Sequence, residues 1–408
     1  MHAKPARGYS PSVLFKVGDH HCLGCRHLIT RTEIKGDVVL IGCGFVADLY
    51  MRSFSTFPSI RVIGAFDKIT ARSGKFCSFW GIPVFESIED CLNALPSGGV
   101  VLNLTNPNAH YEVNQAILDS GHHCYSEKPL AMDMGQARAL HELAQSRGLM
   151  LASAPCSVLG EAAQTLARAV RDQVAGPARL IYAELDDGFI PQAPVEDWRS
   201  ESDAPWPYED EFQVGCTLEH AGYYLSWLIA MFGTVRTVVA ASAEVLPDKR
   251  GVENAAPDVS VATLFFDDGP VVRLTCSIVA PHDHQIRIIG DKGMLSVKQA
   301  WHNGAAVRFH RRFRLRRRLI DSPFGRRLRL RGPTHPKVGR WGAAAMNFAL
   351  GPAEMLAAIA EGRPCRLSNE FALHLNEVTL AIQNAGESSG AQAMTTTCPP
   401  MPLMEWAV

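Results

Sequence analysis

The six residues from Gly42 to Ala47 have the spacing G-x-G-x-x-A, which suits binding of the phosphates of a dinucleotide. Gly42 permits a tight turn, Gly44 lets the backbone approach a pyrophosphate, and Ala47 allows a helix to pack closely on a strand. A helix that begins here offers free N–H groups and a partial positive charge to the phosphates. The cofactor contacts expected from this segment are Gly42, Cys43, Gly44, Phe45 and Val46.

Asp67, at the end of the next apolar run, bears on which nucleotide fits. Its carboxylate is expected to accept hydrogen bonds from the adenosine ribose and to repel a 2′-phosphate, which favours NAD. Lys68 and Arg72 lie close by in the sequence, and their positive charge suits NADP. NAD is therefore the expected cofactor, with NADP as the alternative.

The segment Ser126-Glu127-Lys128-Pro129 follows another apolar run, at the carboxyl end of a strand, where open α/β sheets bind ligands. Hydride leaves a carbinol carbon only as the hydroxyl proton is removed, so the site needs a group that handles this proton. Burial beside a positive nicotinamide ring should lower the pKa of a lysine. Lys128 is the expected catalytic residue, and Glu127 is expected to hold it or to contact the nicotinamide ribose. Pro129 fixes the backbone after the lysine, and a cis peptide is compatible with this position.

Between these motifs lies Thr105-Asn106-Pro107-Asn108-Ala109-His110, and the order of the three segments resembles the Gfo/Idh/MocA family of oxidoreductases. The resemblance covers residues 37–300 and 345–385. It implies an N-terminal Rossmann domain, a C-terminal α/β domain with an open sheet, and a nicotinamide nucleotide. It also implies hydride transfer at a hydroxyl-bearing carbon of a sugar, polyol or related compound, with Lys128 as the family's catalytic lysine. Further expected cofactor contacts are Thr105, Asn106, Asn108, His110, Glu127 and Lys128.

One family motif is altered in this chain. The family usually carries a helical sequence resembling D-x-G-x-H-x-x-D, whose histidine pairs with the lysine on the reacting hydroxyl. The matching segment has Glu219, Tyr223 and Ser226 in place of the first Asp, the His and the last Asp. Helical spacing puts these three side chains on one stripe, so they are expected to face the site as a set.

Tyr223 is the expected acid–base partner of Lys128, because some branches of the family carry tyrosine at this position. A tyrosine has an ordinary pKa near ~10 and needs a nearby cation, which Lys128 supplies. Two alternatives stay open: Tyr223 and Tyr224 only pack at the rim, or His220 is the base. The expected substrate contacts are Lys128, Glu219, Tyr223 and Tyr224.

Three other segments have less specific patterns. Residues 20–27 hold five possible metal ligands in eight positions, but a zinc site usually needs a second pair at a suitable distance, so no metal site is expected. Residues 186–210 form a Pro-rich segment with Asp186 and Asp187, expected as a loop that either holds substrate or serves only as a lid.

The third segment, residues 308–331, contains eleven arginines. If the segment is a β-strand, in which side chains alternate between two faces, six cationic positions lie on one face and apolar residues lie on the opposite face. This predicts a strand or hairpin at a solvated edge or subunit contact, and a helix is not excluded. The cationic positions are Arg308, His310, Arg312, Arg314, Arg316 and Arg318; the apolar positions are Phe309, Phe313, Leu315 and Leu319.

The elements that position these groups form two series. Residues 37–155 alternate short apolar runs with helices, which predicts a Rossmann-type doubly wound parallel sheet. Residues 156–408 show strands in succession with tight turns, which predicts an α+β domain with a mostly antiparallel open sheet. Helices expected at Glu211–Phe232, Pro352–Glu361 and Asn369–Ala385 should cover its other face. Residues 1–36 are expected to be an N-terminal extension of this α/β protein.

The composition excludes several classes of protein. The chain has 408 residues, 47% hydrophobic and 20% charged, with a net charge of −1 and 11 cysteines. These values exclude wholesale disorder, a disulfide scaffold and a strongly charged nucleic-acid binder. No apolar run reaches the ~18 residues of a membrane span, and a cytoplasmic location is expected. The expected partners are a small polyhydroxylated substrate and further copies of the chain, in a dimer or tetramer, rather than nucleic acid.

Three functions are compatible with these observations. The favoured one is an NAD(P)-dependent oxidoreductase acting on a secondary hydroxyl or keto group of a sugar, polyol or sugar derivative. A second keeps NAD but cleaves glycosidic bonds by an elimination-type route, as some relatives of the family do. A third is a non-catalytic nucleotide-binding sensor or scaffold, suggested by the loss of the usual histidine.

Overall fold

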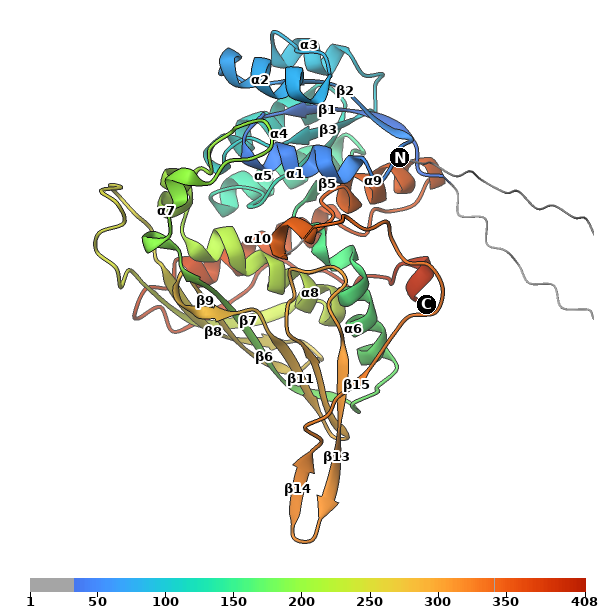
Figure 1. Ribbon diagram of the computed structural model, residues 1–408, viewed down its shortest axis with the longest axis vertical. Helices are drawn as coiled ribbons and strands as arrows, with labels where there is room; N and C mark the ends of the chain where they lie inside the picture. The colour runs from blue at the N-terminus through green and yellow to red at the C-terminus, as the bar shows by residue number, and fades with distance from the viewer. Residues whose placement is uncertain (1–32, 341) are drawn as a thin grey trace, which may run out of the picture. The chain divides into compact units, whose positions relative to one another are not determined.

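A computed structural model describes residues 33–340 and 342–408 of the protein (Figure 1). Residues 34–408 form one unit. The His/Cys cluster at residues 20–27 and most of the expected extension lie outside the described residues, so the expectations for them stay predictions. Among the described helices, none is both long enough and apolar enough to cross a membrane.

The first sheet confirms the expected Rossmann architecture. Its five parallel strands have the order β2-β1-β3-β4-β5, so the strand order reverses between β1 and β3. The residues Val38 to Ile41 in β1 are completely or almost completely buried, as a strand covered on both faces requires. The strands are β1 (Gly36–Ile41), β2 (Ile60–Phe66), β3 (Val100–Asn103), β4 (His123–Ser126) and β5 (Leu151–Ser153). The helices are α1 (Phe45–Phe54), α2 (Thr70–Trp80), α3 (Ile88–Asn93), α4 (His110–Asp119) and α5 (Met134–Ser146).

The second sheet has eleven strands and is mostly antiparallel, as predicted. Its main path is β14-β13-β12-β11-β6-β9-β8-β7-β16, with β10 paired to β6 and β15 paired to β13. The central pair β6 and β9 is parallel, which makes the sheet mixed. Its strands are β6 (Ala178–Phe189), β7 (Val235–Ala243), β8 (Val259–Phe266), β9 (Val271–Ser277), β10 (Val279–Asp283), β11 (Ile286–Gly290), β12 (Gly293–Val297), β13 (Arg308–Leu315), β14 (Arg318–Asp321), β15 (Arg326–Arg327) and β16 (Ala391–Ala393).

The helix expected over Glu211–Phe232 is wrong as a single element. The chain forms α7 (Tyr208–Val214), the π-helical segment η5 (Thr217–Ala221) and α8 (Gly222–Phe232). Gly215 interrupts the series with φ +96°, and a Cβ there would meet the side chains of Gln383 and Ala256. This close approach of distant segments, which a local apolar pattern does not contain, breaks the helix.

The remaining helices are α6 (Glu161–Arg171), α9 (Leu350–Glu361) and α10 (Asn369–Gln383). The expectation that α9 covers the second sheet is wrong, because α9 packs on β3 and β4 of the first sheet. Helix α10 contacts both sheets, through β5 on one side and through β7 and β8 on the other (Figure 1). A helical apolar pattern shows that one side is buried but not which sheet buries it.

The Arg-rich run forms the hairpin β13–β14, which extends away from the rest of its sheet (Figure 1). The predicted alternation fails at the turn, because Leu315 pairs with Arg318 and Arg314 pairs with Leu319. Residues beyond the turn therefore change faces relative to the simple period of two. Leu319 in the hairpin is 73% exposed and Phe324 after it is 88% exposed, so this segment presents apolar as well as cationic side chains.

Candidate active site

The glycine turn lies at the carboxyl ends of β1 and β3, where the strand order reverses and open α/β sheets bind ligands. Gly42 has φ +101°, and a Cβ there would lie 2.5 Å from the backbone of Leu104. At Gly44, by contrast, a Cβ would meet nothing within 4 Å. Open space thus lies over the first N–H groups of α1, and this arrangement fits the pyrophosphate of a dinucleotide.

Asp67 is held against this turn by backbone groups. Its Oδ2 accepts a hydrogen bond from the Cys43 N–H at 2.9 Å, and its Oδ1 accepts one from the Ile69 N–H at 2.8 Å. Each oxygen keeps a further lone pair, so the carboxylate remains able to accept from ribose hydroxyls. Arg72 Nη1 lies 3.8 Å from Asp67 Oδ2, and Lys68 is exposed beside it. The structure therefore brings together the turn and the residues expected to choose between NAD and NADP.

Three of the expected turn contacts are limited to the backbone or to part of a side chain. The Cys43 thiol is completely buried in the core, so only the main chain of this residue faces the turn. Phe45 and Val46 are half-buried at the start of α1.

The loop after β3 holds Thr105, Asn106 and Asn108 at the same edge of the sheet. Thr105 is half-buried and donates its hydroxyl to Asn103 Oδ1 at 2.6 Å. Asn106 is exposed and donates to the Asp210 carboxylate, which belongs to α7 in the second half of the chain. Asn108 is exposed as well.

The expectation that His110 contacts the cofactor is not supported by its position. The residue is 0% exposed, and its ring nitrogens lie 2.6 Å from the Pro129 carbonyl oxygen and 2.9 Å from the Thr105 carbonyl oxygen. Burial lowers the pKa of His110, and the two carbonyl oxygens, which can each accept an N–H, oppose this effect in part. His110 therefore packs between the Thr105 loop and the lysine segment and acts as a support.

Lys128 extends from the end of β4 and forms an ion pair with Glu219 of the π-helical segment η5. The side chains are 17% and 4% exposed, respectively. The contact joins the two halves of the chain, and a small pocket beside it is lined by residues of both. Its lining includes Lys128, Pro129, Pro155, Leu218, Gly222 and Leu375. The peptide bond before Pro129 is cis, as the sequence suggested.

The pKa expected for Lys128 is corrected by its surroundings in the protein alone. Burial lowers the pKa of this amine, but the Glu219, Glu211 and Glu127 carboxylates outweigh burial, and the net pKa is raised. Lys128 is therefore an ammonium group at neutral pH before any nucleotide binds.

Glu211, which the sequence analysis missed, lies in the same charged cluster. Burial raises the pKa of Glu211 well above its ordinary value, the nearby Glu219 carboxylate raises it further, and Lys128 opposes both effects. These effects together favour the protonated, uncharged form of Glu211. Glu211 lies on α7, and the helix break at Gly215 separates it from Glu219. The spacing of one continuous helix therefore does not predict that the two side chains meet.

Glu127 does not hold the Lys128 amine. Its Oε1 accepts a hydrogen bond from the Tyr50 hydroxyl at 2.6 Å, and its Oε2 accepts one from the Lys128 backbone N–H at 3.1 Å. Burial raises the pKa of Glu127, although Lys128 lowers it in part. Glu127 therefore fixes the backbone that carries the lysine, while Glu219 supplies the ion pair.

Of the expected stripe Glu219–Tyr223–Ser226, only the first two side chains remain at the site. Tyr223 is half-buried, and its ring centroid lies 5.0 Å from that of Trp301. Ser226 is 0% exposed and donates to the Tyr223 carbonyl oxygen, so it does not face the site. Tyr224 is also 0% exposed, and the substrate contact expected of it stays a prediction.

The lowered tyrosine pKa that the sequence analysis required is absent. Burial raises the pKa of Tyr223, and the opposing effect of Lys128 does not compensate. Tyr223 therefore carries its proton at neutral pH and can donate a hydrogen bond.

His220 lies between two carboxyl groups that the sequence analysis did not connect with it. Its Nε2 is 3.8 Å from Glu211 Oε2, and its Nδ1 is 3.8 Å from Asp187 Oδ2. The ring stacks with Trp301 at a centroid distance of 5.8 Å. Burial lowers the pKa of His220, while Asp187 raises it in part, so the imidazole is neutral and can accept a proton.

Asp186 and Asp187 were expected in a loop, and this is wrong, because β6 continues to Phe189 and contains both. Burial raises the pKa of Asp187, but His284, His220 and His282 outweigh burial and lower it overall. The end of β6 is extended because it pairs with β10, which is distant in the sequence. The prolines that follow Asp187 in the sequence had instead indicated a loop.

Comparison with known proteins agrees with this architecture. A family model described as an oxidoreductase family with an NAD-binding Rossmann fold matches residues 37–154, and the GFO/IDH/MocA C-terminal domain matches residues 163–296.

Individual relatives are distant. The UDP-N-acetylglucosamine 3-dehydrogenase of Acidithiobacillus ferrooxidans is 26% identical over 154 residues, 38% of this chain and 46% of that enzyme. The inositol 2-dehydrogenase/D-chiro-inositol 3-dehydrogenase of Lactiplantibacillus plantarum is 31% identical over 102 residues, 24% of this chain and 29% of that enzyme. The chain therefore spans less than half the length of these two relatives.

Similar solved structures show the same fold. An inositol dehydrogenase homolog from Azotobacter vinelandii, complexed with NADH and myo-inositol, has a TM-score of 0.68 at 14% identity and covers 88% of this chain and 98% of its own. Together, the two consecutive family matches and the shared fold show that the chain belongs to the GFO/IDH/MocA family of oxidoreductases.

Proposed function

We propose that the protein is an NAD-dependent oxidoreductase that transfers hydride between the nicotinamide and a secondary hydroxyl or keto group of a sugar, polyol or sugar derivative. The observation that carries this proposal is the placement of Lys128. The amine stands at the carboxyl edge that also holds the glycine turn, and it is paired with Glu219 from the second half. NAD is preferred to NADP because Asp67 is fixed at the turn as a hydrogen-bond acceptor.

The bound nicotinamide supplies the hydride acceptor or donor, and the side chains of this chain handle the proton. In oxidation of an alcohol, the C–H electron pair leaves with the hydride and the hydroxyl proton passes to the protein. Lys128, an ammonium group in the free protein, must first lose a proton to solvent, and the positive charge of a bound nicotinamide ring would favour this loss. In carbonyl reduction, the same ammonium protonates the forming alkoxide.

Tyr223 and His220 remain the two candidates for the partner of Lys128. Tyr223 is a hydrogen-bond donor that can orient the reacting oxygen, because its pKa is raised by burial. His220 is neutral, and its Nε2 lies 3.8 Å from Glu211 Oε2. We therefore assign the substrate-orienting role to Tyr223, and the wider proton network to Glu211 and His220.

Two relatives support the substrate class by their names, since one acts on UDP-N-acetylglucosamine and the other on inositols. Both substrates are rich in hydroxyl groups. We infer a polyhydroxylated substrate for this protein.

The test begins with thermal shifts in NAD and NADP, followed by polyols, aldoses and nucleotide sugars with the better cofactor. NADH formation is then measured for the wild type, for Lys128→Ala and for Lys292→Ala as a surface control in the exposed turn between β11 and β12. We expect Lys128→Ala to lower kcat by about 1,000-fold, and Lys292→Ala to keep kcat.

Unchanged activity of Lys128→Ala on every substrate that the wild type turns over would refute the assignment. Substrate turnover without net NADH formation would instead indicate the glycoside-cleaving route.

A further inference from the structure

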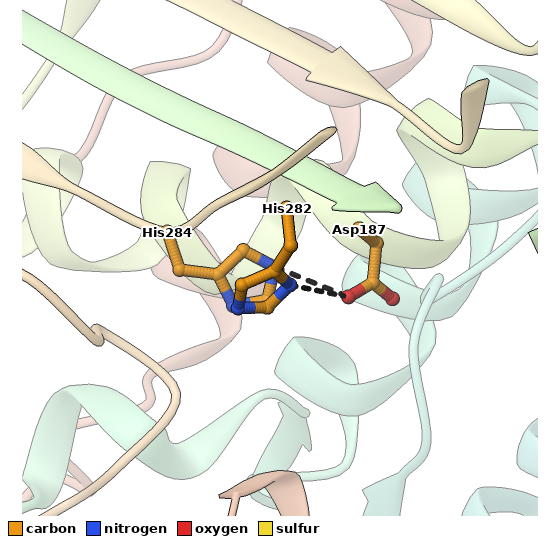
Figure 2. Close-up of side chains that lie close together, drawn as sticks. All are labelled: Asp187, His282 and His284. Atoms are coloured by element: carbon orange, nitrogen blue, oxygen red, sulfur yellow. Dashed lines mark ion pairs between the residues drawn. The ribbon is translucent and has the colours of Figure 1, made fainter. Parts of the chain in front are cut away.

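Three side chains of metal-binding type converge where β10 pairs with the end of β6: Asp187, His282 and His284 (Figure 2). One ligand atom from each lies within 4.8 Å of the others. His282 Nδ1 is 3.7 Å from Asp187 Oδ1, and His284 Nε2 is 3.2 Å from the same oxygen. Figure 2 shows both imidazole rings pointing toward this carboxylate.

The local strand register produces this convergence. Ala280 pairs with Gly188 and Asp283 pairs with Asp186, so two residues of β10 lie opposite Asp187 alone. Such a bulge redirects a side chain, and here His282 lies in the extra segment. His284 follows two positions later, which places it on the same side of an extended chain.

The spacing of the ligand atoms suits a small divalent ion. A tetrahedral zinc site with bonds of about 2.0–2.1 Å has ligand–ligand edges of roughly 3.3–3.4 Å. The two edges at Asp187 Oδ1, 3.2 and 3.7 Å, lie on either side of this value. Two imidazoles and one carboxylate are also a ligand set that zinc and iron(II) commonly use.

A second observation points into the same space. His284 is 2% exposed, and its Nε2 contacts Asp187 Oδ1 at 3.2 Å without the alignment of a hydrogen bond. A buried nitrogen whose hydrogen-bonding capacity is unmet is costly, and coordination by a metal would satisfy its lone pair. The ring is held in place by Trp301, at a centroid distance of 4.5 Å, and by Tyr224, at 6.4 Å.

The second carboxylate oxygen of Asp187 has its own neighbour. His220 Nδ1 lies 3.8 Å from Asp187 Oδ2. Residues beside a ligating carboxylate help to orient it in metal sites. The group thus has three ligand side chains, a buried ligand nitrogen whose hydrogen-bonding capacity is unmet and a neighbouring residue beside the carboxylate.

We propose that Asp187, His282 and His284 bind a divalent transition-metal ion, with Zn²⁺ as the probe ion. Three protein ligands leave a coordination position for water or for an oxygen of a bound molecule. Trp301 packs against both His284 and Tyr223, so the ion would lie next to the residue assigned to orient substrate. A substrate carrying a second oxygen donor, such as a further hydroxyl or a carboxylate, would suit this arrangement.

The metal test uses the full-length chain, freed of metal by a chelator and titrated with Zn²⁺ by calorimetry, with bound metal counted by elemental analysis. Asp187→Asn and His284→Gln should weaken binding by about 100-fold or more, because each removes a ligand. Asp186→Asn is the matched control, since this neighbouring carboxylate accepts from the Ser277 hydroxyl instead. It should bind Zn²⁺ as the wild type does.

The cysteines and histidines of residues 20–27 require a separate control, and Cys22→Ser/Cys25→Ser provides it. Co²⁺ bound by thiolates gives a strong charge-transfer absorption, whereas histidine and carboxylate ligands do not. The proposed site should persist in this double variant. If His284→Gln fails to fold, His282→Ala replaces it, because the His282 side chain is 49% exposed.

Absence of Zn²⁺ binding by the wild type, or equal affinity in wild type and Asp187→Asn, would overturn the metal site. The group would then be a set of His–Asp ion pairs. NAD affinity is measured on the same proteins and should not change. Loss of the metal site would leave the assignment of Lys128 untouched, and failure of Lys128 would leave the metal measurement untouched.

Discussion

The two sides of the candidate active site are built by different means. On the nucleotide side, backbone groups dominate: the turn at Gly42, the N–H groups at the start of α1, and Asp67 fixed by two main-chain donors. On the other side, charged side chains dominate, with Lys128 beside Glu219 and Glu211.

This contrast has consequences for how each side tolerates change. A backbone site depends on the space and conformation of a few glycines, so an added methyl group is sufficient to disrupt it. A charged site depends on the balance of burial against neighbouring charges, so isosteric substitutions that alter one charge are the informative ones.

Gly42→Ala should have the largest effect on the fold. The new Cβ would lie 2.5 Å from backbone atoms of Leu104, in a residue with φ +101°. We expect the free energy of unfolding to fall by about 4 kcal/mol or more, measured by denaturant titration.

Gly44→Ala is the companion variant. It tests the effect of a methyl group in the phosphate space without the backbone strain expected at Gly42. Its φ of −81° suits alanine, and its Cβ would meet no protein atom within 4 Å. Stability should therefore stay close to that of the wild type, while NAD affinity falls by about 10-fold or more because the methyl group occupies the phosphate space. Unchanged NAD affinity would contradict the assignment of this turn.

Glu219→Gln should have the next largest effect. Because the folded-state pKa of Lys128 is raised, its charge stabilises the fold below the ordinary lysine pKa of about 10.4, and this contribution is lost as the pH rises through the raised value. Removing the counter-charge should lower the free energy of unfolding at pH 7 by about 3 kcal/mol.

The same variant should also change catalysis. Without the Glu219 carboxylate, burial lowers the pKa of Lys128, so the pH at which kcat/KM for oxidation reaches its plateau should move downward. Glu209→Gln, on exposed surface nearby in the sequence, is the control. A profile of Glu219→Gln that overlays the wild-type profile would mean that the ion pair is not part of the proton path.

Tyr223→Phe should have a smaller effect, because the proposed role is one hydrogen bond to the reacting oxygen. We expect kcat to fall by about 10- to 100-fold with little change in stability. His220→Gln is compared under the same conditions. A larger loss in His220→Gln than in Tyr223→Phe would reverse the two assignments.

The smallest effect is expected in the hairpin. Replacement of Arg312, Arg314 and Arg316 by Ser should leave NAD affinity unchanged, because these residues lie on β13 and its turn, outside the first sheet. The measurement is fluorescence quenching or calorimetry with NAD. A large loss of affinity would show that the hairpin reaches the nucleotide, and the division into two sides would need revision.

The nucleotide side could be predicted from the sequence because its signals are local. The glycine turn, Asp67 and Lys128 each follow an apolar run directly, and parallel strands bring their carboxyl ends to one edge. His110 shows the limit of this reasoning, since a loop position at the correct edge still turned its ring inward to two carbonyl groups.

The opposite side could be predicted only in part. Glu219 and Tyr223 were accessible through helical spacing, but Glu211 is separated from them by the break at Gly215. Asp187 and His282 come from β6 and β10, whose pairing contains a bulge. Such contacts are set by the register of distant segments, which no local period encodes.

Helix α10 packs on α5 and β5 through one flank and on β7 and β8 through another. If either sheet unfolds, apolar side chains of α10 that pack on it become exposed to solvent. We therefore expect the two halves to unfold together on heating or in denaturant, because both lose contacts when this helix is lost.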